Sequence, residues 1–311
     1  MTIIQGINKN QEIQSGEYII TRGVGGNYWV NSLAKPGEEI QCNAPGIFKN
    51  QGLKPIAGDL VFCEETGDEL IPLVMQEIYE RKNELPRPQV ANIDLLWLII
   101  PLSQPEPDLN VLDKMLVISE VQNMNVEIIF TKYDLASDFG DELASIYKNL
   151  GYNVFLSKPN SESLFNELRD KIAHKLICLA GPSGAGKSTL LNILAQNDLM
   201  ETGDISKKLG RGRHTTRHAE LFPFRGGYVT DTPGFSSLEL TQLNIDGQDL
   251  AFAFPEIREL QYNCRFNSCK HLEEPGCAVK ESEAIDKGRL ERYQNFRKTI
   301  DSFNSYDRRK N

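Results

Sequence analysis

The sequence lacks any hydrophobic run long enough to cross a membrane, since its longest continuous apolar stretch is Leu95 to Ile100. It also lacks a basic segment followed by an apolar one in its first residues, which read MTIIQGINKNQE. These absences argue against the usual signals for insertion and secretion, so we expect a soluble cytoplasmic protein with no membrane partner. Nothing in the sequence indicates an obligate dimer, and we expect a monomer.

Excess positive charge is missing as well, because the formal net charge is −9 at pH 7. This balance argues against a protein that coats nucleic acid with its whole surface, although the basic stretch 285–311 allows a local contact. The six cysteines do not form a disulfide pattern. Three stand singly in strand-like runs and are expected to be small buried hydrophobes: Cys42, Cys63 and Cys178.

Short β-rich runs separated by turn signals occupy residues 17–78. This pattern is typical of a small closed barrel, of which the OB-fold is the commonest cytosolic kind. Such a barrel either binds oligonucleotides or serves only as a packing partner, and both readings stay open. The charged, proline-bearing segment 81–88 then predicts a linker. Beyond it, strands and helices alternate, which predicts a mostly parallel sheet with helices on both faces.

The stretch 176–192, LICLAGPSGAGKSTLLN, passes from an apolar strand through a glycine-rich loop into a helix. Small residues let successive backbone N–H groups surround a phosphate, and the helix adds its positive end. Lys187 would reach the outer phosphates, and the hydroxyl of Ser188 would bind Mg²⁺. The alternative is a glycine-rich turn that merely precedes a helix. We predict a nucleoside triphosphate site with these loop residues: Gly181, Pro182, Ser183, Gly184, Ala185, Gly186, Lys187, Ser188 and Thr189.

A base-reading segment, TKYD, follows the predicted strand 126–130 directly, and open α/β sheets bind ligands at such strand ends. The Asp134 carboxylate can accept two hydrogen bonds from guanine that adenine does not offer, while the Lys132 stem packs along the base. Ser157 and Lys158 end the next strand and would contact the base edge. Alone, a Lys-x-Asp pattern is often only a solvated loop.

Residues 207–217 are basic and glycine-bearing, with no hydrophobic period, and predict a mobile loop. The hydroxyl of Thr215 or Thr216 can complete Mg²⁺ coordination while the γ-phosphate is present. Asp231 would close the metal shell, and Gly234 would offer its N–H to the γ-phosphate. A basic surface loop without metal contact is the alternative. Because TKYD and SK precede GPSGAGKS, HTT and DTPG, the motif order predicts a circularly permuted GTPase.

Cys264, Cys269, His271 and Cys277 lie close together in the sequence and suit a closed tetrahedral Zn²⁺ site. Their spacing is unusual, so unrelated thiols remain the alternative. A following helix is expected to bury one side and expose the other. The buried side would carry Leu290, Tyr293 and Ile300, and the exposed side Arg289, Arg292 and Lys298.

Together these motifs, with the segment CRFNSCKHLEEPGC, resemble the RsgA (YjeQ) family, the small ribosomal subunit-dependent GTPases of bacteria. The likeness covers nearly the whole chain. We expect an OB-fold β-barrel over 1–82, a circularly permuted α/β P-loop GTPase domain over 89–240 and a zinc-binding, mostly helical domain over 241–311. The resemblance implies GTP and GDP as ligands, Mg²⁺ with GTP and one structural Zn²⁺. It also implies slow hydrolysis stimulated by the small subunit, contact with 16S ribosomal RNA and a role in late subunit maturation.

The resemblance also bears on catalysis. Phe235 follows Gly234, so the glutamine that orients water in Ras-like enzymes is absent. In the family the histidine before the paired threonines is assigned that task, which here is His214, with an RNA contact as the alternative. Lys187 is the second candidate catalytic group. Thr131 stands where asparagine is usual, but its hydroxyl can still tether the phosphate loop, so guanine preference should survive while affinity falls.

Two rival functions stay open at this point. One is a zinc-stabilised RNA-binding scaffold that uses GTP only as a structural or regulatory ligand. The other is an ATP-dependent kinase or ATPase on the same phosphate loop. Stimulation by small subunits distinguishes the first from a GTPase, and the guanine preference predicted from Asp134 distinguishes the second.

Overall fold

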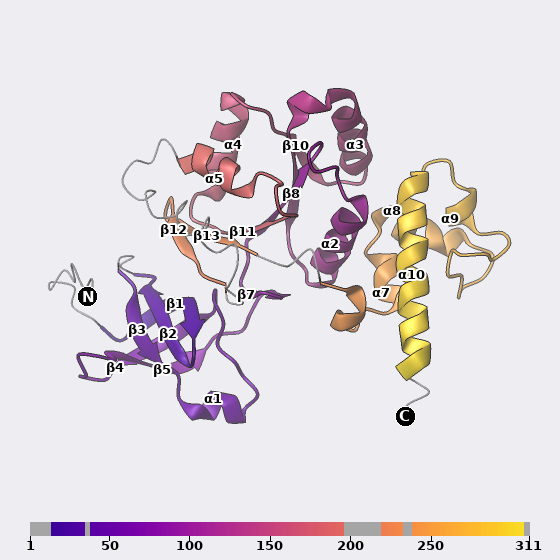
Figure 1. Cartoon of the computed structure of the whole chain (residues 1–311). Helices are drawn as coiled ribbons and strands as arrows, with labels where there is room; N and C mark the ends of the chain where they lie inside the picture. Colours follow the sequence, from indigo (N-terminus) through magenta and orange to yellow (C-terminus); the bar gives the residue numbers. More distant parts are fainter. Residues whose placement is uncertain (1–13, 35–37, 196–218, 233–237, 308–311) are drawn as a thin grey trace. The chain divides into compact units, whose positions relative to one another are not determined.

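The computed structural model describes residues 14–34, 38–195, 219–232 and 238–307 (Figure 1). It divides into two compact units, of which the first holds the chain up to Glu84, Gln89–Asn92 and a short segment ending at Leu221. The second unit holds the rest, including both the predicted GTPase domain and the predicted C-terminal domain. Among the described residues, no helix combines the length and apolar character that a membrane span requires.

The first unit is built on a closed five-stranded barrel with strand order β1-β2-β3-β5-β4, which confirms the predicted N-terminal barrel (Figure 1). Alternate side chains point inward, so Ile20, Val30 and Val61 are fully buried in its core. Cys42 and Cys63 lie in the same core, as predicted for single cysteines. The elements are β1 Gly16–Val24, β2 Asn27–Ser32, β3 Ile40–Asn43, α1 Gly46–Asn50, β4 Leu60–Glu65 and β5 Leu73–Ile78. Of two short strands, β6 Glu84–Pro86 lies in the expected linker 81–88 and β7 Gln89–Ala91 follows it.

The second unit contains a six-stranded sheet with strand order β10-β9-β8-β11-β13-β12, in which only the edge strand β12 is antiparallel. The strands are β8 Leu95–Pro101, β9 Val126–Thr131, β10 Asn153–Leu156, β11 Leu176–Ala180, β12 Phe222–Phe224 and β13 Gly227–Asp231. Every residue of β8 and β11 is buried, which explains their unbroken apolar sequences. The predicted mostly parallel sheet is therefore confirmed.

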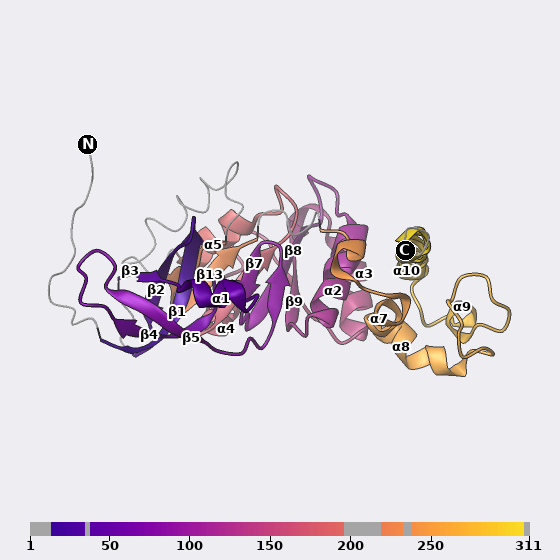
Figure 2. The same cartoon turned by 90° about the horizontal axis from the view of Figure 1, so that it is seen from below.

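Helices cover both faces of this sheet (Figure 2). Helices α4 Glu162–Ile172 and α5 Lys187–Ala195 pack against the face that carries Trp97, Ile99 and Leu179. Helix α3 Ser137–Asn149 lies on the other face, where its Tyr147 ring meets the Phe130 ring with centroids 6.1 Å apart. Helix α2 Leu109–Val121 follows β8.

The C-terminal part is mostly helical, as predicted, and comprises η3 Leu240–Leu243, α7 Gly247–Phe252, α8 Pro255–Leu260, η4 Gln261–Asn263, α9 Ala278–Glu281 and α10 Lys287–Asp307. Tyr293 and Ile300 of α10 are buried, as expected. The expected exposure of Arg289 is wrong, because only 2% of this residue is accessible. Its guanidinium ion-pairs with Asp113 of α2 and with Glu256 of α8, at 2.6 Å to the latter.

Candidate functional site

The phosphate loop leaves the sheet at the carboxyl end of β11. A Cβ atom on Gly181 would lie 2.1 Å from the carbonyl oxygen of Ile99, so only glycine fits where the chain turns out of the strand. The Lys187 ammonium group donates to the carbonyl oxygens of Gly181, at 2.8 Å, and Pro182, at 3.1 Å. Helix α5 starts at Lys187, so its positive N-terminal end lies at the loop. This is the strand, loop and helix arrangement expected of a phosphate site.

The base-reading segment is joined to this loop by one buried hydrogen bond. The Thr131 hydroxyl donates to the carbonyl oxygen of Ala185 at 2.6 Å, and Thr131 is 7% exposed. The predicted tether is therefore confirmed, although the two residues are 54 positions apart. The bond joins the end of β9 to the loop that follows β11, at the edge of the sheet where ligands bind in open α/β folds.

The two segments predicted to read the base are hydrogen-bonded to each other. Tyr133 N–H donates to the Ser157 carbonyl at 3.1 Å, and Ser157 N–H donates to the Phe130 carbonyl at 2.8 Å. The short turn η1 Tyr133–Leu135 leaves Asp134 exposed to solvent at this edge. Lys158 is also exposed. A ligand at the edge can therefore meet both segments at once.

One contributor was not predicted, the loop that follows β8. The Lys132 ammonium group donates to the carbonyl oxygen of Gln104, whose φ is +44°. The neighbouring Pro105 would lie 3.4 Å from a Cβ atom placed on Gly184. This loop thus touches both the base-reading segment and the phosphate loop. Its only sequence signal is its place at the carboxyl end of a parallel strand, because a backbone carbonyl leaves no mark on residue type.

Asp231 ends β13, which lies beside β11 in the sheet. Among the groups that the structure describes, its buried Oδ1 atom has no hydrogen-bond partner. Burial raises the pKa of Asp231, while the charge of Lys187 and the N–H of Thr232 oppose that shift. A buried carboxylate oxygen without a donor, close to a phosphate loop, suits a hard divalent cation such as Mg²⁺. Ser188, the second residue of α5, offers a hydroxyl next to Lys187.

Four predicted residues lie outside the described ranges: His214, Thr215, Thr216 and Gly234. Their catalytic and metal-binding roles therefore stay predictions.

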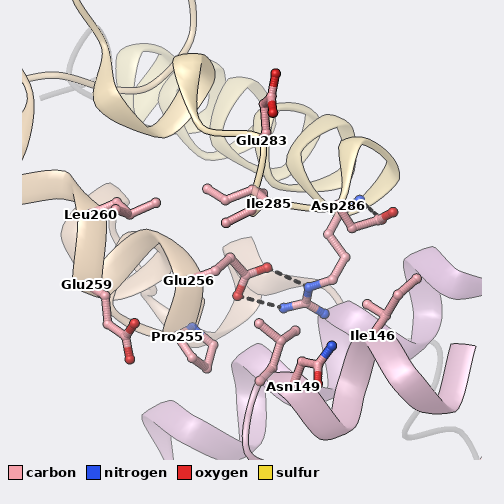
Figure 3. A pocket seen from close by; sticks show the side chains of 12 residues that line it. Ile146, Asn149, Pro255, Glu256, Glu259, Leu260, Glu283, Ile285 and Asp286 are labelled. Carbon is pink, nitrogen blue, oxygen red and sulfur yellow. Dashed lines mark hydrogen bonds and ion pairs between the residues drawn. The ribbon is translucent and has the colours of Figure 1, made fainter.

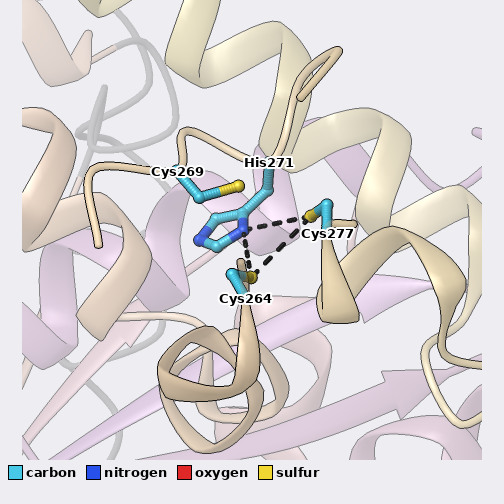
Figure 4. Close-up of side chains that lie close together, drawn as sticks. All are labelled: Cys264, Cys269, His271 and Cys277. Atoms are coloured by element: carbon cyan, nitrogen blue, oxygen red, sulfur yellow. Dashed lines mark hydrogen bonds between the residues drawn. The ribbon is translucent and has the colours of Figure 1, made fainter. Parts of the chain in front are cut away.

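A second candidate centre unites the four predicted zinc ligands (Figure 4). The Nδ1 atom of His271 lies 3.6 Å from the sulfur of Cys264 and 3.4 Å from that of Cys277. The two sulfurs are 3.9 Å apart, and the ligand atoms of all four residues, including Cys269, lie within 4.8 Å of one another. Ligands about 2.1–2.3 Å from a tetrahedral Zn²⁺ are separated by roughly 3.5–3.8 Å, so this donor set fits that ion.

Burial has opposite effects on the two kinds of ligand in this cluster. It lowers the pKa of His271, which favours the neutral imidazole that metals require. It raises the pKa of Cys269 to about 12, so the thiol resists ionisation unless a cation stabilises the thiolate.

Comparison with known proteins gives consistent matches. The RsgA GTPase family model matches residues 78–241. The small ribosomal subunit biogenesis GTPase RsgA of Clostridium perfringens is 38% identical over 290 residues, which cover 92% of this chain and 97% of that protein. Its namesake from Bacillus subtilis is 38% identical over 281 residues, covering 88% and 92%.

Two solved structures are similar over most of the chain. The circularly permuted GTPase YloQ has a TM-score of 0.75 and 33% identity, covering 94% of this chain and 97% of that one. YjeQ from Thermotoga maritima has a TM-score of 0.76 and 32% identity, covering 92% and 98%.

Proposed function

The chain belongs to the RsgA GTPase family, and on that premise we propose that docking on the small ribosomal subunit triggers its hydrolysis of GTP. It is a circularly permuted GTP hydrolase of small-subunit biogenesis. We propose a monomer that acts in the cytoplasm during late maturation, with 16S ribosomal RNA among the surfaces it contacts.

The observation that supports a single nucleotide site is the Thr131 to Ala185 hydrogen bond of 2.6 Å. It holds the base-reading segment and the phosphate loop at one edge of the sheet. In the proposed complex, Asp134 accepts from guanine, Lys132 lies along the base, and Ser157 and Lys158 approach the base edge. The phosphates lie in the loop 181–189, with Lys187 on the outer ones.

Magnesium would be held by Ser188 and Asp231, with Thr215 or Thr216 completing the shell. When bound, Mg²⁺ neutralises charge on the β- and γ-phosphates. Asp231 brings an acceptor atom that has no donor among the described residues, and Lys187 adds a second positive charge beside it. Gly234 would donate its N–H to the γ-phosphate.

The attacking water needs a positioning group, because Phe235 stands after Gly234 where Ras-like enzymes have glutamine. We assign this task to His214 or to a group supplied by the ribosome. In either case docking would order the loop that carries the Thr215 and Thr216 hydroxyls.

Zinc would be bound by Cys264, Cys269, His271 and Cys277. Four protein ligands leave no open position, so the ion is structural and takes no part in hydrolysis. It fixes the loop between η4 and α9, which otherwise has little regular structure.

Single-turnover hydrolysis with and without purified small subunits tests the proposal. We expect subunits to raise the rate of GTP hydrolysis. We also expect unlabelled GTP and GDP, but not ATP, to compete with GTP for the site. The substitution Asp134→Asn should shift preference toward xanthosine nucleotides, because the amide offers a donor where the carboxylate accepted. If subunits bind without stimulating hydrolysis, the chain uses GTP as a scaffold's ligand and the proposal is wrong.

A further inference from the structure

A cavity of about 590 Å³ lies within the second unit, and none of its lining residues belongs to the proposed nucleotide site (Figure 3). Three segments far apart in the sequence form it. Ile146 and Asn149 come from α3, Glu256 and Glu259 come from α8, and the segment 283–286 precedes α10. The cavity is therefore formed where α8 and the start of α10 meet the C-terminal end of α3.

Four of the lining residues are apolar, and we call them the floor of the cavity: Ile146, Leu150, Leu260 and Ile285. The paired charges of Glu256 and Arg289 also belong to the lining. Among the floor residues, Ile285 is buried, and the other three are half-buried. An occupant must therefore bring apolar surface of its own to gain from binding.

The rim, in contrast, is negatively charged. Arg289, the one cation among the described residues that line the cavity, is already paired with Asp113 and Glu256, so it offers little to an anion. Glu259 and Glu283 are exposed at the rim and make no ion pair with any residue that the structure describes. The cavity thus combines an apolar floor with two unpaired carboxylates.

We propose that this cavity docks a basic segment of a small-subunit protein, one that carries Lys or Arg beside an aliphatic side chain. The aliphatic group lies on the floor, and the cation meets Glu259 and Glu283 at the rim. RNA does not fit the same surface, because its phosphates would face carboxylates with no free cation to receive them. This inference rests on the proposed function, since it names one contact through which the chain holds the subunit.

Charge reversal tests the proposal, because it should weaken binding to a basic protein segment and strengthen binding to RNA. The double variant Glu259→Lys, Glu283→Lys should bind purified small subunits roughly tenfold more weakly at low salt, and the difference should shrink as salt rises. The neutral variant Glu259→Gln, Glu283→Gln should show a smaller loss, because it removes attraction without adding repulsion. Binding is measured by cosedimentation with a non-hydrolysable GTP analogue.

The matched control is the double variant Glu167→Lys, Asp170→Lys, at two exposed positions on α4 that do not line the cavity. It makes the same change in net charge as the charge-reversal variant and should leave subunit binding as in the wild type. Neither Glu259 nor Glu283 is part of the nucleotide site, so hydrolysis without subunits should be unchanged in all variants. Equal thermal midpoints would show that the variants fold.

Tighter binding of the Lys variants would mean that the cavity faces RNA, and unchanged binding would mean that it faces nothing on the subunit. Either result overturns the inference while leaving the proposed function intact. If the wild-type protein itself failed to bind subunits, the proposed function and this inference would both fall.

Discussion

At the scale of single residues, Thr131 links the proposed base-reading segment to the phosphate loop. Replacing it by valine keeps the shape and removes the hydroxyl that donates to Ala185 at 2.6 Å. A buried hydrogen bond of this kind contributes about 1–1.5 kcal/mol, so GDP and GTP should bind roughly tenfold more weakly. Thr131→Ser, which keeps the donor, should bind close to wild type. The measurement is a nucleotide titration.

In the proposed complex Asp134 and not Thr131 selects the base, so the ratio of guanine to adenine affinity should be equal in wild type and Thr131→Val. A changed ratio would show that Thr131 positions Asp134 as well as the phosphate loop.

Tyr147 gives a pH test of the buried charges. Its hydroxyl donates to Asp113 at 2.8 Å, and burial, together with the Asp113 charge, raises its pKa well above the usual 10. The folded state therefore keeps this proton while the unfolded chain loses it above pH 10. The contribution of Tyr147 to the free energy of unfolding is therefore full below pH 10. It falls by about 1.4 kcal/mol for each pH unit above 10.

We expect Tyr147→Phe to cost about 1–3 kcal/mol at pH 8, because a buried carboxylate loses a donor. At pH 11 the difference in unfolding free energy between the two proteins should be smaller. The wild type loses stability above pH 10 because its folded state keeps the Tyr147 proton, and the Phe variant has no such proton. The free energy of unfolding in urea measures both. All other tyrosines are common to the two proteins, so their titration cancels in the difference. A difference in unfolding free energy that is the same at pH 8 and pH 11 would contradict the raised pKa of Tyr147.

At the scale of elements, helix α10 is held by buried charge. Arg289 joins Asp113 of α2 and Glu256 of α8, and its guanidinium lies 4.9 Å from the Phe254 ring centre. Arg289→Met would leave both carboxylates buried with fewer partners, at a cost of about 3–5 kcal/mol in unfolding free energy. Lys298→Met, at an exposed position of the same helix, should change stability by less than about 0.5 kcal/mol.

A small effect of Arg289→Met in urea unfolding would mean that the remaining Arg292, which also pairs with Asp113, can neutralise the site alone. Arg289→Lys separates charge from shape, because a lysine keeps the charge but cannot reach two carboxylates with a planar fork. It should be intermediate in stability between the wild type and the Met variant.

Helix α10 also shows which buried side chains can be predicted from the sequence and which cannot. The 3.6-residue period correctly buries Tyr293 and Ile300. The same period places Arg289, one turn before Tyr293, on the buried face as well, but its charge argued for exposure. The partners that allow its burial, Asp113 and Glu256, lie 176 and 33 positions away. Periodicity shows that a helix has two faces, but only tertiary packing decides whether a charged face meets water or buried carboxylates.

The backbone geometry of the proposed nucleotide site was easier to predict, because its glycines and hydroxyls serve fixed steric and hydrogen-bonding needs. Gly181 must lack a Cβ atom, and Thr131 must reach a carbonyl oxygen, so residue type reports geometry at both positions. Gln104 contributes only a backbone carbonyl, which any residue could supply. Its residue type is therefore no indication of the contact, and only its place after a strand could have pointed to it.

At the scale of the whole molecule, the barrel and the Cys₃His cluster belong to different compact units. The barrel has its own closed sheet and its own core, in which Ile20 and Val30 are fully buried. If zinc fixes only the loop between η4 and α9, its removal should destabilise that loop without affecting the barrel. Hydrogen exchange followed by mass spectrometry, with and without a strong chelator, measures both parts in one experiment.

We expect chelation to release one zinc per chain and to abolish amide protection across residues 264–281, while strands β1 to β5 exchange at unchanged rates. Cys269→Ser should reproduce the effect without chelator, because three ligands hold the ion less tightly than four. Cys63→Ser serves as the control, since that cysteine lies in the barrel core far along the chain from the cluster. It should weaken the barrel and leave zinc bound. Loss of barrel protection on chelation would show instead that the two units fold as one cooperative body, with zinc stabilising the whole chain.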